Sequence, residues 1–396
     1  MTRARVPGEV PRAGQTGRMA ETNWAGNHTY RARIERVRSV EHLQEVVAAS
    51  PRVRALGSRH SFTDLTDITD ADGGVLVSCV DLPTTVEVDE TARTARVTGH
   101  AAYGDVATRL QAGGWALANL ASLPHISVAG AVSTGTHGSG VENGSLATAV
   151  TALDIVGPDG EIRSVRRGDA DFEGSVVALG ALGIVTAVTL EVEPTYDVRQ
   201  VVRTGLSWPT LAAEIDAVMG SAYSVSLFTR WGEHGVEQVW LKSRSAAAPV
   251  ELHGAPAATA TLHMLDGGAI ESVTTQGGVA GPWLDRLPHF RRELTPSRGE
   301  ELQSEYLLPR EHALTAVDRL RGLRDLLAPV LQVSELRTVA ADRHWLSTSY
   351  GHDVVGVHFT WLRPRARVCR VARRRAGAAA AGGPPALGEV LRRRGP

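Results

Sequence analysis

The sequence predicts an α+β protein with two domains. The chain has 396 residues, which is more than one ordinary hydrophobic core accommodates. Short runs rich in β-branched residues are mixed with segments of helical spacing, and a second block of such elements begins near residue 196. We therefore expect an N-terminal domain over residues 23–195 and a second domain over 196–362. Residues 1–22 are expected to be a disordered extension, and 363–396 form a tail of different composition.

The elements of the N-terminal domain follow from periodicity and turn residues. Val40, Leu43 and Val47 recur at helical spacing, which predicts an amphipathic helix over 40–49. A second helix is expected over 103–110, stopped by two glycines. A Gly-Pro-Asp-Gly sequence between two apolar runs predicts a hairpin. Strands are expected over 53–56, 75–80, 86–88, 95–98, 152–156, 162–165 and 184–192.

The second domain shows the same mixture of patterns. Residues 224–231 and 237–242 are expected to be paired strands, and 331–339 and 354–361 further strands. Residues 311–327 have helical spacing. The Ala- and Pro-rich stretch 246–260 is expected to be a loop. No Gly-x-Gly-x-x-Gly follows a strand, so the sequence does not favour a Rossmann fold.

Composition excludes several classes of function. Only Cys79 and Cys369 are present, which argues against a disulfide framework and fits a reducing cytoplasm. No apolar run approaches the length of a membrane span, and the N-terminus lacks the apolar core of a secretory signal. The tail carries ten arginines and one acid, whereas the other 362 residues carry 32 basic and 42 acidic residues. Such an acidic body does not indicate nucleic-acid binding, and we expect no metal site.

Two segments are dense in glycine, hydroxyl side chains and histidine. Residues 55–62 read ALGSRHSF, and residues 121–130 and 134–140 read ASLPHISVAG and TGTHGSG. Glycine lets a backbone approach a ligand closely, and successive exposed amides bind anions such as a pyrophosphate. An apolar run, a glycine and then His60 place that histidine on a loop directly after a strand. Alone, each segment could equally be an ordinary surface loop.

Together these segments resemble the FAD-linked oxidases of the vanillyl-alcohol-oxidase type, and within them the bacterial alditol oxidases. The resemblance runs from about Asn23 to Trp361. Further matching stretches are NWAGN at 23–27, GALGIVT at 180–186, ELQSEYL at 301–307 and SELRTVAAD at 334–342. The resemblance implies a two-domain vanillyl-alcohol-oxidase-like flavoprotein, with an N-terminal FAD-binding domain and a substrate (cap) domain whose sheet covers the flavin.

The resemblance also implies the cofactor and the residues that hold it. His60 occupies the position where the family attaches FAD covalently through an imidazole nitrogen. The family often has glycine directly before this histidine, whereas this chain has Arg59. The expected cofactor-binding residues are Leu56, Gly57, Ser58, Arg59, His60, Ser61, Phe62, Ser122, Ser127, Gly130, Ser133, Thr134, Gly135, Thr136, His137, Gly138 and Ile184.

Glu335 and Arg337 are two apart on a predicted strand, so both side chains point to one face, beside Val333 and Val339. Charges among apolar neighbours are costly unless they are paired or functional. The alternative is a surface ion pair of little energetic value. In the alditol oxidases these two positions contact substrate, as do those matching Ser122 and Thr360. Thr360 shares its strand face with His358, and it could otherwise be an ordinary strand residue.

The implied reaction is oxidation of the primary alcohol of an alditol such as xylitol or sorbitol. A hydride passes to the flavin, and oxygen becomes hydrogen peroxide. Arg337 would stabilise the developing alkoxide, while Ser122, Glu335 and Thr360 orient the hydroxyls. The partners are then a polyol and oxygen, without nucleic acid or membrane, and the family suggests a monomer. The alternatives are a sugar-lactone oxidase or dehydrogenase of the same superfamily, or a truncated flavin-binding chain with little or no activity.

The resemblance stops after Trp361. The family continues to a Pro-His-Trp-Gly-Lys motif, whose lysine lies beside the flavin, but this chain becomes rich in Arg, Ala, Gly and Pro. One explanation is a disordered basic tail. The other is a reading-frame shift, because codons for PALGEVL at 385–391 exist whose next frame reads Pro-His-Trp-Gly-Lys-Ser. Resequencing the DNA around codons 361–366 tests this hypothesis.

Overall fold

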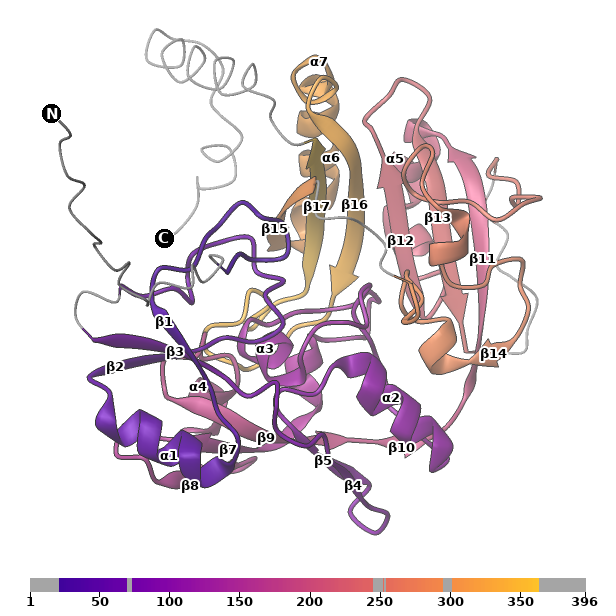
Figure 1. The fold of residues 1–396 in the computed structure, drawn as a ribbon. Helices are drawn as coiled ribbons and strands as arrows, with labels where there is room; N and C mark the ends of the chain where they lie inside the picture. Colours follow the sequence, from indigo (N-terminus) through magenta and orange to yellow (C-terminus); the bar gives the residue numbers. More distant parts are fainter. Residues whose placement is uncertain (1–20, 70–72, 245–251, 253, 295–300, 363–396) are drawn as a thin grey trace, which may run out of the picture.

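The computed structural model describes residues 21–69, 73–244, 252, 254–294 and 301–362. Its strands form a three-stranded, a five-stranded and a seven-stranded sheet, with a two-stranded pair of β6 and β10. Figure 1 shows the two smaller sheets on one side of the molecule and the seven-stranded sheet on the other, with helix α3 between them. This mixture of helices and mostly antiparallel strands is the expected α+β class. The disordered extension and the altered tail lie, except for Glu21 and Thr22, outside the described residues.

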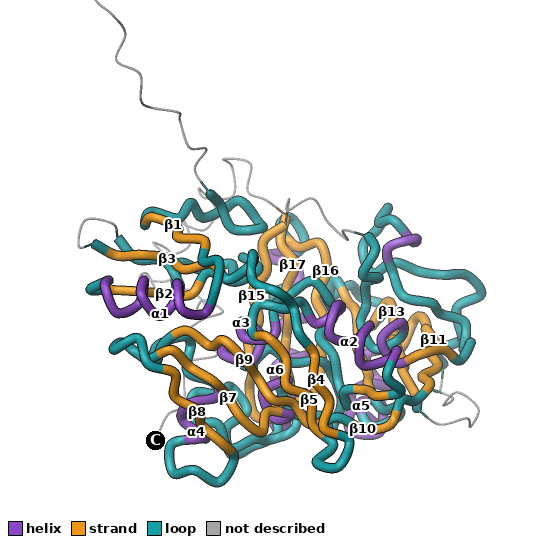
Figure 2. Tube along the Cα trace, turned by 60° about the horizontal axis from the view of Figure 1, so that its bottom comes forward, coloured by secondary structure: helices purple, strands orange, loops and turns teal. Residues whose placement is uncertain are grey.

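The first half of the chain forms two sheets. The smaller one is parallel, in the order β1-β3-β2, and consists of Arg33–Arg36, Gly74–Ser78 and Arg52–Ala55. Helix α1 packs on it, and Figure 2 shows α1 beside β2 and β3. The larger sheet has the order β4-β5-β9-β7-β8. Its strands are Val86–Asp89 (β4), Thr94–Thr98 (β5), Ile184–Glu191 (β9), Val150–Val156 (β7) and Ile162–Arg166 (β8).

Helix α1, Val40–Ala49, illustrates how the local sequence sets an element. Ser39 caps its N-terminus and accepts a hydrogen bond from the backbone N–H of His42 at 3.1 Å. Leu43 and Val47 lie one turn apart and are buried, in a cluster that includes Val75 of β3. The helix therefore begins at a polar cap and buries the apolar stripe that the sequence predicts.

The second half of the chain forms the seven-stranded sheet, in the order β14-β11-β13-β12-β16-β17-β15 with antiparallel pairs throughout. Its strands are Gly281–Pro282 (β14), Asp197–Leu206 (β11), Val236–Ser243 (β13), Ser224–Thr229 (β12), Leu331–Val339 (β16), Val354–Leu362 (β17) and Glu301–Pro309 (β15). The change from one sheet to the other falls between Pro194 and Asp197, and the domain boundary at residue 195 remains a prediction.

Helices cover one face of this sheet. Trp208 and Leu211 of α5 (Trp208–Met219) and Leu320 of α6 (Ala313–Gly322) share a core cluster with Leu336 and Phe359 of the sheet. Because neighbouring residues of a strand point to opposite faces, Glu335, Arg337, His358 and Thr360 point away from these helices. The strand pattern thus places the predicted polar residues on the face that looks toward the N-terminal half.

Three sequence expectations need correction. The helix expected over 311–327 is a 3₁₀ turn, then α6, then α7 (Arg324–Leu327), and the break follows Gly322, a residue that weakens helices. The strand expected over 224–231 ends at Thr229, because Trp231 turns the chain with a φ of 63°. The second glycine-rich segment is not loop throughout, since Val128–Ser133 form α3.

The remaining elements are short connections and one longer helix. In the expected loop 246–260, residues 246–251 and 253 lie outside the described residues. No helix in the described part of the chain is long and apolar enough to cross a membrane. The longer helix of this remaining group is α2 (Tyr103–Ala112). The short elements are β6 (Trp115–Ala116), the 3₁₀ turn Leu146–Ala149, α4 (Phe172–Val176), β10 (Glu193–Pro194) and the 3₁₀ turns Ile270–Ser272, Trp283–Asp285 and Arg310–His312.

Candidate active site

A cavity of about 530 Å³ lies between the two halves of the chain. One wall, which we call the loop wall, consists of residues 56–62 and the lining residues between 121 and 137. The other, the sheet wall, consists of side chains from β15, β16 and β17. The volume lies in the range typical of small-molecule sites. The two sequence segments singled out by their glycines and the predicted strand face therefore meet at one site.

In the loop wall, the loop after β2 contacts the start of α3 through Ser127. Ser127 lies between Gly57 and Gly130, and its Oγ atom would be 2.9 Å and 2.8 Å from a Cβ atom added at these glycines. The backbone N–H of Ser127 donates to the Ser58 hydroxyl at 3.1 Å. A side chain at position 57 or 130 would have to displace the Ser127 hydroxyl. The two glycines thus leave room for the Ser127 hydroxyl, and the hydrogen bond from Ser127 to Ser58 joins the loop after β2 to the start of α3.

His60 lies on the loop wall, and its imidazole ring stacks on Trp24 with centroids 5.6 Å apart. Its Nδ1 atom is buried and has no hydrogen-bond partner among the described residues. Burial, and secondly the charge of His125, lower the pKa of His60 to about 4, while the Ser58 backbone opposes the shift. The ring is therefore neutral at physiological pH. A buried ring nitrogen without a protein partner is what a nitrogen that bonds a cofactor requires.

Arg59 adopts a left-handed backbone conformation with φ at 65°. Glycine adopts this conformation without the steric cost that a Cβ atom brings, so the position suits the glycine that the family often has. The Arg59 carbonyl accepts a hydrogen bond from the Trp24 N–H at 2.9 Å, and its guanidinium pairs with Glu21 at 2.6 Å. These two contacts hold Arg59 in its left-handed conformation. The next residue, His60, therefore stays on the loop wall although Arg59 is not glycine.

The sheet wall carries a row of ionisable residues in register. Glu335 of β16 lies opposite His358 of β17, which lies opposite Glu305 of β15. In the next row Arg337 lies opposite Gly356. A Cβ atom on Gly356 would be 2.8 Å from the Glu305 Oε1 atom. The missing side chain thus leaves the space through which Arg337 reaches Glu305 across the middle strand.

Arg337 is buried between two carboxylates. Its Nη2 atom is 2.8 Å from Glu305 Oε1, and its Nε atom is 3.7 Å from Glu335 Oε1, which permits attraction without a hydrogen bond. Burial alone raises the pKa of each carboxyl, but Arg337 and neighbouring histidines outweigh burial and lower both pKa values. The two carboxylates in turn raise the pKa of Arg337 against its burial. All three groups are charged, and the pair is not the surface ion pair considered as the alternative.

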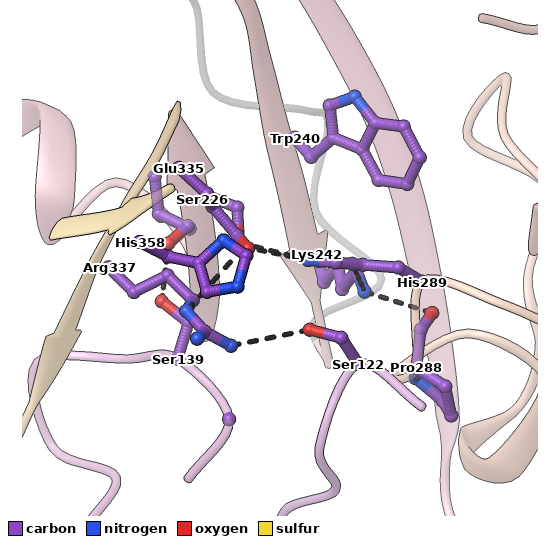
Figure 3. A network of polar contacts seen from close by, with 12 residues as sticks. Ser122, Ser139, Ser226, Trp240, Lys242, Pro288, His289, Glu335, Arg337 and His358 are labelled. Carbon is purple, nitrogen blue, oxygen red and sulfur yellow. Dashed lines mark hydrogen bonds and ion pairs between the residues drawn. The ribbon is translucent and has the colours of Figure 1, made fainter. Parts of the chain in front are cut away.

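Contacts also join the two walls. Figure 3 shows Arg337 directed at Ser122, whose Oγ atom accepts a hydrogen bond from Nη1 at 3.3 Å. His137 of the loop wall places Nε2 3.3 Å from Glu305 Oε2, while its Nδ1 lies 2.9 Å from the Gly138 carbonyl. The guanidinium therefore contacts a hydroxyl from the first half of the chain and lies beside carboxylates from the second half.

The structure brings most of the predicted site residues to this cavity. Three predicted residues do not line it: Ser133 ends α3, Gly138 packs on Asn119, and the Ile184 side chain lies in a core cluster. Those that line it are Leu56, Gly57, Ser58, Arg59, His60, Ser61, Phe62, Ser122, Ser127, Gly130, Thr134, Gly135, Thr136, His137, Glu335, Arg337 and Thr360.

Four further polar residues of the site escaped sequence reasoning. Gln303 and Glu305 line the cavity from β15, and the alternation rule applied to residues 301–309 would have found them. His289 contacts Glu335 through a 2.8 Å hydrogen bond from Nε2. Lys242 lies behind His289. No local pattern predicts the last two, because they reach the site from an irregular segment and from a distant strand.

The loop wall fits an FAD cofactor. A ligand would find close backbone at Gly57, the hydroxyls of residues 58, 61 and 134, and the unpartnered nitrogen of His60. Aromatic and aliphatic side chains complete the lining, which suits a flat ring system. When bound, FAD supplies the acceptor for a hydride and the means of reducing oxygen.

Comparisons with known proteins agree that the chain binds FAD. Residues 32–166 match the family model described as an FAD binding domain. The chain is 49% identical over 357 residues to an alditol oxidase of Streptomyces sp., covering 90% of this chain and 85% of that protein. It is 28% identical over 368 residues to an L-gulono-1,4-lactone dehydrogenase of Mycobacterium tuberculosis, covering 85% and 82% of the two chains.

Solved structures agree on the fold. A crystal structure of cholesterol oxidase from B. sterolicum aligns with a TM-score of 0.68 at 14% identity, covering 88% of this chain and 80% of that one. Fold, cavity and FAD-binding domain define an FAD-dependent oxidoreductase of the vanillyl-alcohol-oxidase type. Within that class, the chain belongs to the alditol oxidase family.

Proposed function

We propose that the chain oxidises the primary alcohol of alditols, such as xylitol and sorbitol, to aldoses, with oxygen reduced to hydrogen peroxide. The observation that carries the proposal is the cavity in which the loop wall faces Arg337 between Glu305 and Glu335. A polyol offers a series of hydroxyls, each a donor and an acceptor. The sheet wall offers a cation and carboxylates side by side to match them.

The residues of the sheet wall would then divide the work. Arg337 would stabilise negative charge on the reacting oxygen, since its guanidinium is buried and held by two carboxylates. Glu335 would accept a hydroxyl proton in a hydrogen bond, and Ser122 and Thr360 would fix hydroxyls further along the polyol. Burial strengthens each of these contacts compared with water.

His60 would bind FAD covalently. Its neutral ring and unpartnered Nδ1 atom support this part of the proposal. We also propose that the protein acts as a monomer in the cytoplasm, consistent with its two cysteines. Adduct formation uses a ring nitrogen free of its proton, and burial keeps the pKa of His60 near 4.

The test uses the full chain purified with its flavin. A denaturing gel under ultraviolet light reports covalent flavin, and a peroxide assay with xylitol reports turnover. Fluorescence in the wild type and none in His60→Ala is the expected result. A fluorescent His60→Ala chain would contradict attachment at His60, and a fluorescent wild type that makes no peroxide would indicate a flavin-binding chain without turnover.

The second candidate is a sugar-lactone oxidase or dehydrogenase, favoured by the relative from M. tuberculosis. A lactone is cyclic and offers fewer hydroxyl protons than an open-chain polyol, so the paired carboxylates favour the alditol. Parallel assays with xylitol, sorbitol and L-gulono-1,4-lactone separate the two. Greater kcat/KM with the lactone would overturn the alditol assignment.

A further inference from the structure

Lys242 is the one lysine of the chain, beside 41 arginines. It lies on β13, and its side chain is almost completely buried, at 1% exposure. Lysine is rarely buried without a partner, because removing its charge from water is costly. Burial lowers the pKa of Lys242 to about 7, a shift that Glu335 opposes. A chain that otherwise uses arginine thus places its single ammonium in the interior, behind the sheet wall.

Three acceptors surround the Lys242 ammonium. Its Nζ atom donates to the carbonyls of Leu287 and Pro288, the latter at 3.0 Å, and lies 3.0 Å from His289 Nδ1. An ammonium has three donors in a compact tetrahedral arrangement, which matches these acceptors. A guanidinium is planar and larger, and it directs its donors differently. The geometry explains why arginine does not replace lysine here.

Lys242 also sets the tautomer of His289. An ammonium only donates, so Nδ1 of His289 accepts, and in the neutral ring the proton is then on Nε2. That Nε2–H group donates to Glu335 Oε1 at 2.8 Å. Burial, and then the charge of Lys242, lower the pKa of His289 to about 4, so the ring stays neutral. Figure 3 shows Lys242, His289 and Pro288 in this arrangement.

The backbone of residues 289 and 290 also contacts Ser122 of the loop wall. The N–H groups of His289 and Phe290 both donate to the Ser122 carbonyl, at 3.0 Å and 3.2 Å. Residues 287–290 therefore contact Glu335 through a side chain and Ser122 through the main chain. The Lys242 ammonium binds both the carbonyls at the start of this segment and the ring of His289, so it contacts the segment near each of these two interactions.

We propose that Lys242 is the positioning residue of the substrate site: through residues 287–290 it holds Ser122 of the N-terminal half and Glu335 of the sheet at the separation that a polyol requires. Lys242 does not line the cavity, so it acts through these residues and not by contact. The inference rests on the proposed alditol oxidation.

The test compares flavin-loaded wild type with Lys242→Met and Lys242→Arg. Both variants should raise KM for xylitol by about tenfold to a hundredfold, with a smaller fall in kcat and unchanged flavin content, since misplacing binding groups by about 1 Å has effects of this size. Trp231→Phe is the matched control. It removes a buried 2.8 Å hydrogen bond to Ser334 from the helix-covered face of the same sheet, and it should leave KM unchanged.

A second measurement does not depend on the folding of a variant. Lysine labelled with carbon-13 at Cε gives one side-chain resonance in the wild type, because the chain has a single lysine. Xylitol should shift this resonance in the flavin-loaded wild type, because Lys242 contacts His289, which binds Glu335 of the site. An unchanged KM in a folded, flavin-loaded Lys242→Met, or no xylitol shift in an active wild type, would overturn the positioning role alone. A wild type without xylitol turnover would overturn the proposed function, and this inference with it.

Discussion

The two walls of the cavity differ in charge: the loop wall is lined mainly by neutral groups, and the sheet wall carries charged side chains. The loop wall is built from glycine, hydroxyls and a neutral histidine whose Nδ1 atom has no partner among the described residues. On the sheet wall, Arg337 is already paired with Glu305 at 2.8 Å and lies 3.7 Å from Glu335. The loop wall therefore depends on a ligand for its missing contacts. The sheet wall is organised before any ligand arrives.

Unpartnered polar groups and paired charges affect ligand binding and reaction rate in different ways. Buried polar groups without partners raise the free energy of the folded chain, and a ligand that satisfies them binds more tightly for that reason. Charges already paired in a dry environment need little rearrangement when charge develops beside them. We therefore expect loss of the unpartnered His60 ring on the loop wall to change FAD content, and substitutions of the charged residues on the sheet wall to change turnover and stability.

The largest effect is expected from Arg337→Met. It leaves Glu305 and Glu335 buried without their cation, which should lower the free energy of unfolding by about 3–5 kcal/mol. It also removes the cation that we propose stabilises the reacting oxygen, and kcat/KM for xylitol should fall by about 10²–10³-fold. Thermal unfolding and peroxide assays measure the two effects.

Gly356→Ala tests the same ion pair without removing a charge. The added methyl group would meet the Glu305 carboxylate at 2.8 Å, so activity should fall, by less than in Arg337→Met. If Arg337→Met kept the stability and turnover of the wild type, the two walls would not differ in the way described here.

The second effect concerns acid stability. His60 on the loop wall and His289, which also lines the cavity, both have pKa values lowered to about 4 by burial, against 6.5 for an ordinary histidine. Between these values the unfolded chain binds protons that the folded chain does not, so stability falls as pH falls from 6.5 toward 4. Each histidine contributes a slope of at most about 1.4 kcal/mol per pH unit.

Urea unfolding of the flavin-free protein at several pH values measures that slope. His289→Gln and His60→Gln should each flatten it to a similar extent, because burial lowers the pKa of both rings to about 4. Equal slopes in the wild type and both variants would mean that neither ring is held neutral by the fold.

The smallest effect is expected from Arg59→Gly. The substitution relieves a left-handed φ of 65°, worth about 1 kcal/mol, and loses a partly exposed ion pair worth at most about 1 kcal/mol. A net gain of about 0.5 kcal/mol in unfolding free energy should result, with FAD content unchanged. Arg59→Lys keeps the strain and serves as the control. A clear loss of stability in Arg59→Gly would show that the Glu21 contact matters more than the backbone.

The sequence predicted the elements whose apolar pattern is regular. The helix at 40–49 and the strand at 331–339 have the predicted limits in the structure. Strand β11 was missed because buried Gln200 and Arg203 interrupt its apolar pattern. Helix α3 was missed because glycine and serine, which weaken helices, occur in a six-residue segment.

The site was predictable where a strand or a motif places residues together. Alternation put Glu335 and Arg337 on one face, and the structure has both in the cavity. The same rule did not reveal Glu305, because the polar residues Glu301, Gln303 and Ser304 hide the strand β15. His289 and Lys242 depend on long-range contacts across 46 or more positions of sequence, which no local pattern contains.

Strand order has a consequence for synthesis on the ribosome. β15 precedes β16 and β17 in the chain, yet β17 is the one strand with which it pairs in the described sheet. During synthesis, Glu305 therefore leaves the ribosome more than fifty residues before its neighbour His358. Until then β15 has no partner strand, and its edge is polar. Such an edge resists wrong pairing with other chains. The N-terminal sheets can close first, and the charged wall forms only after β17 has left the exit tunnel.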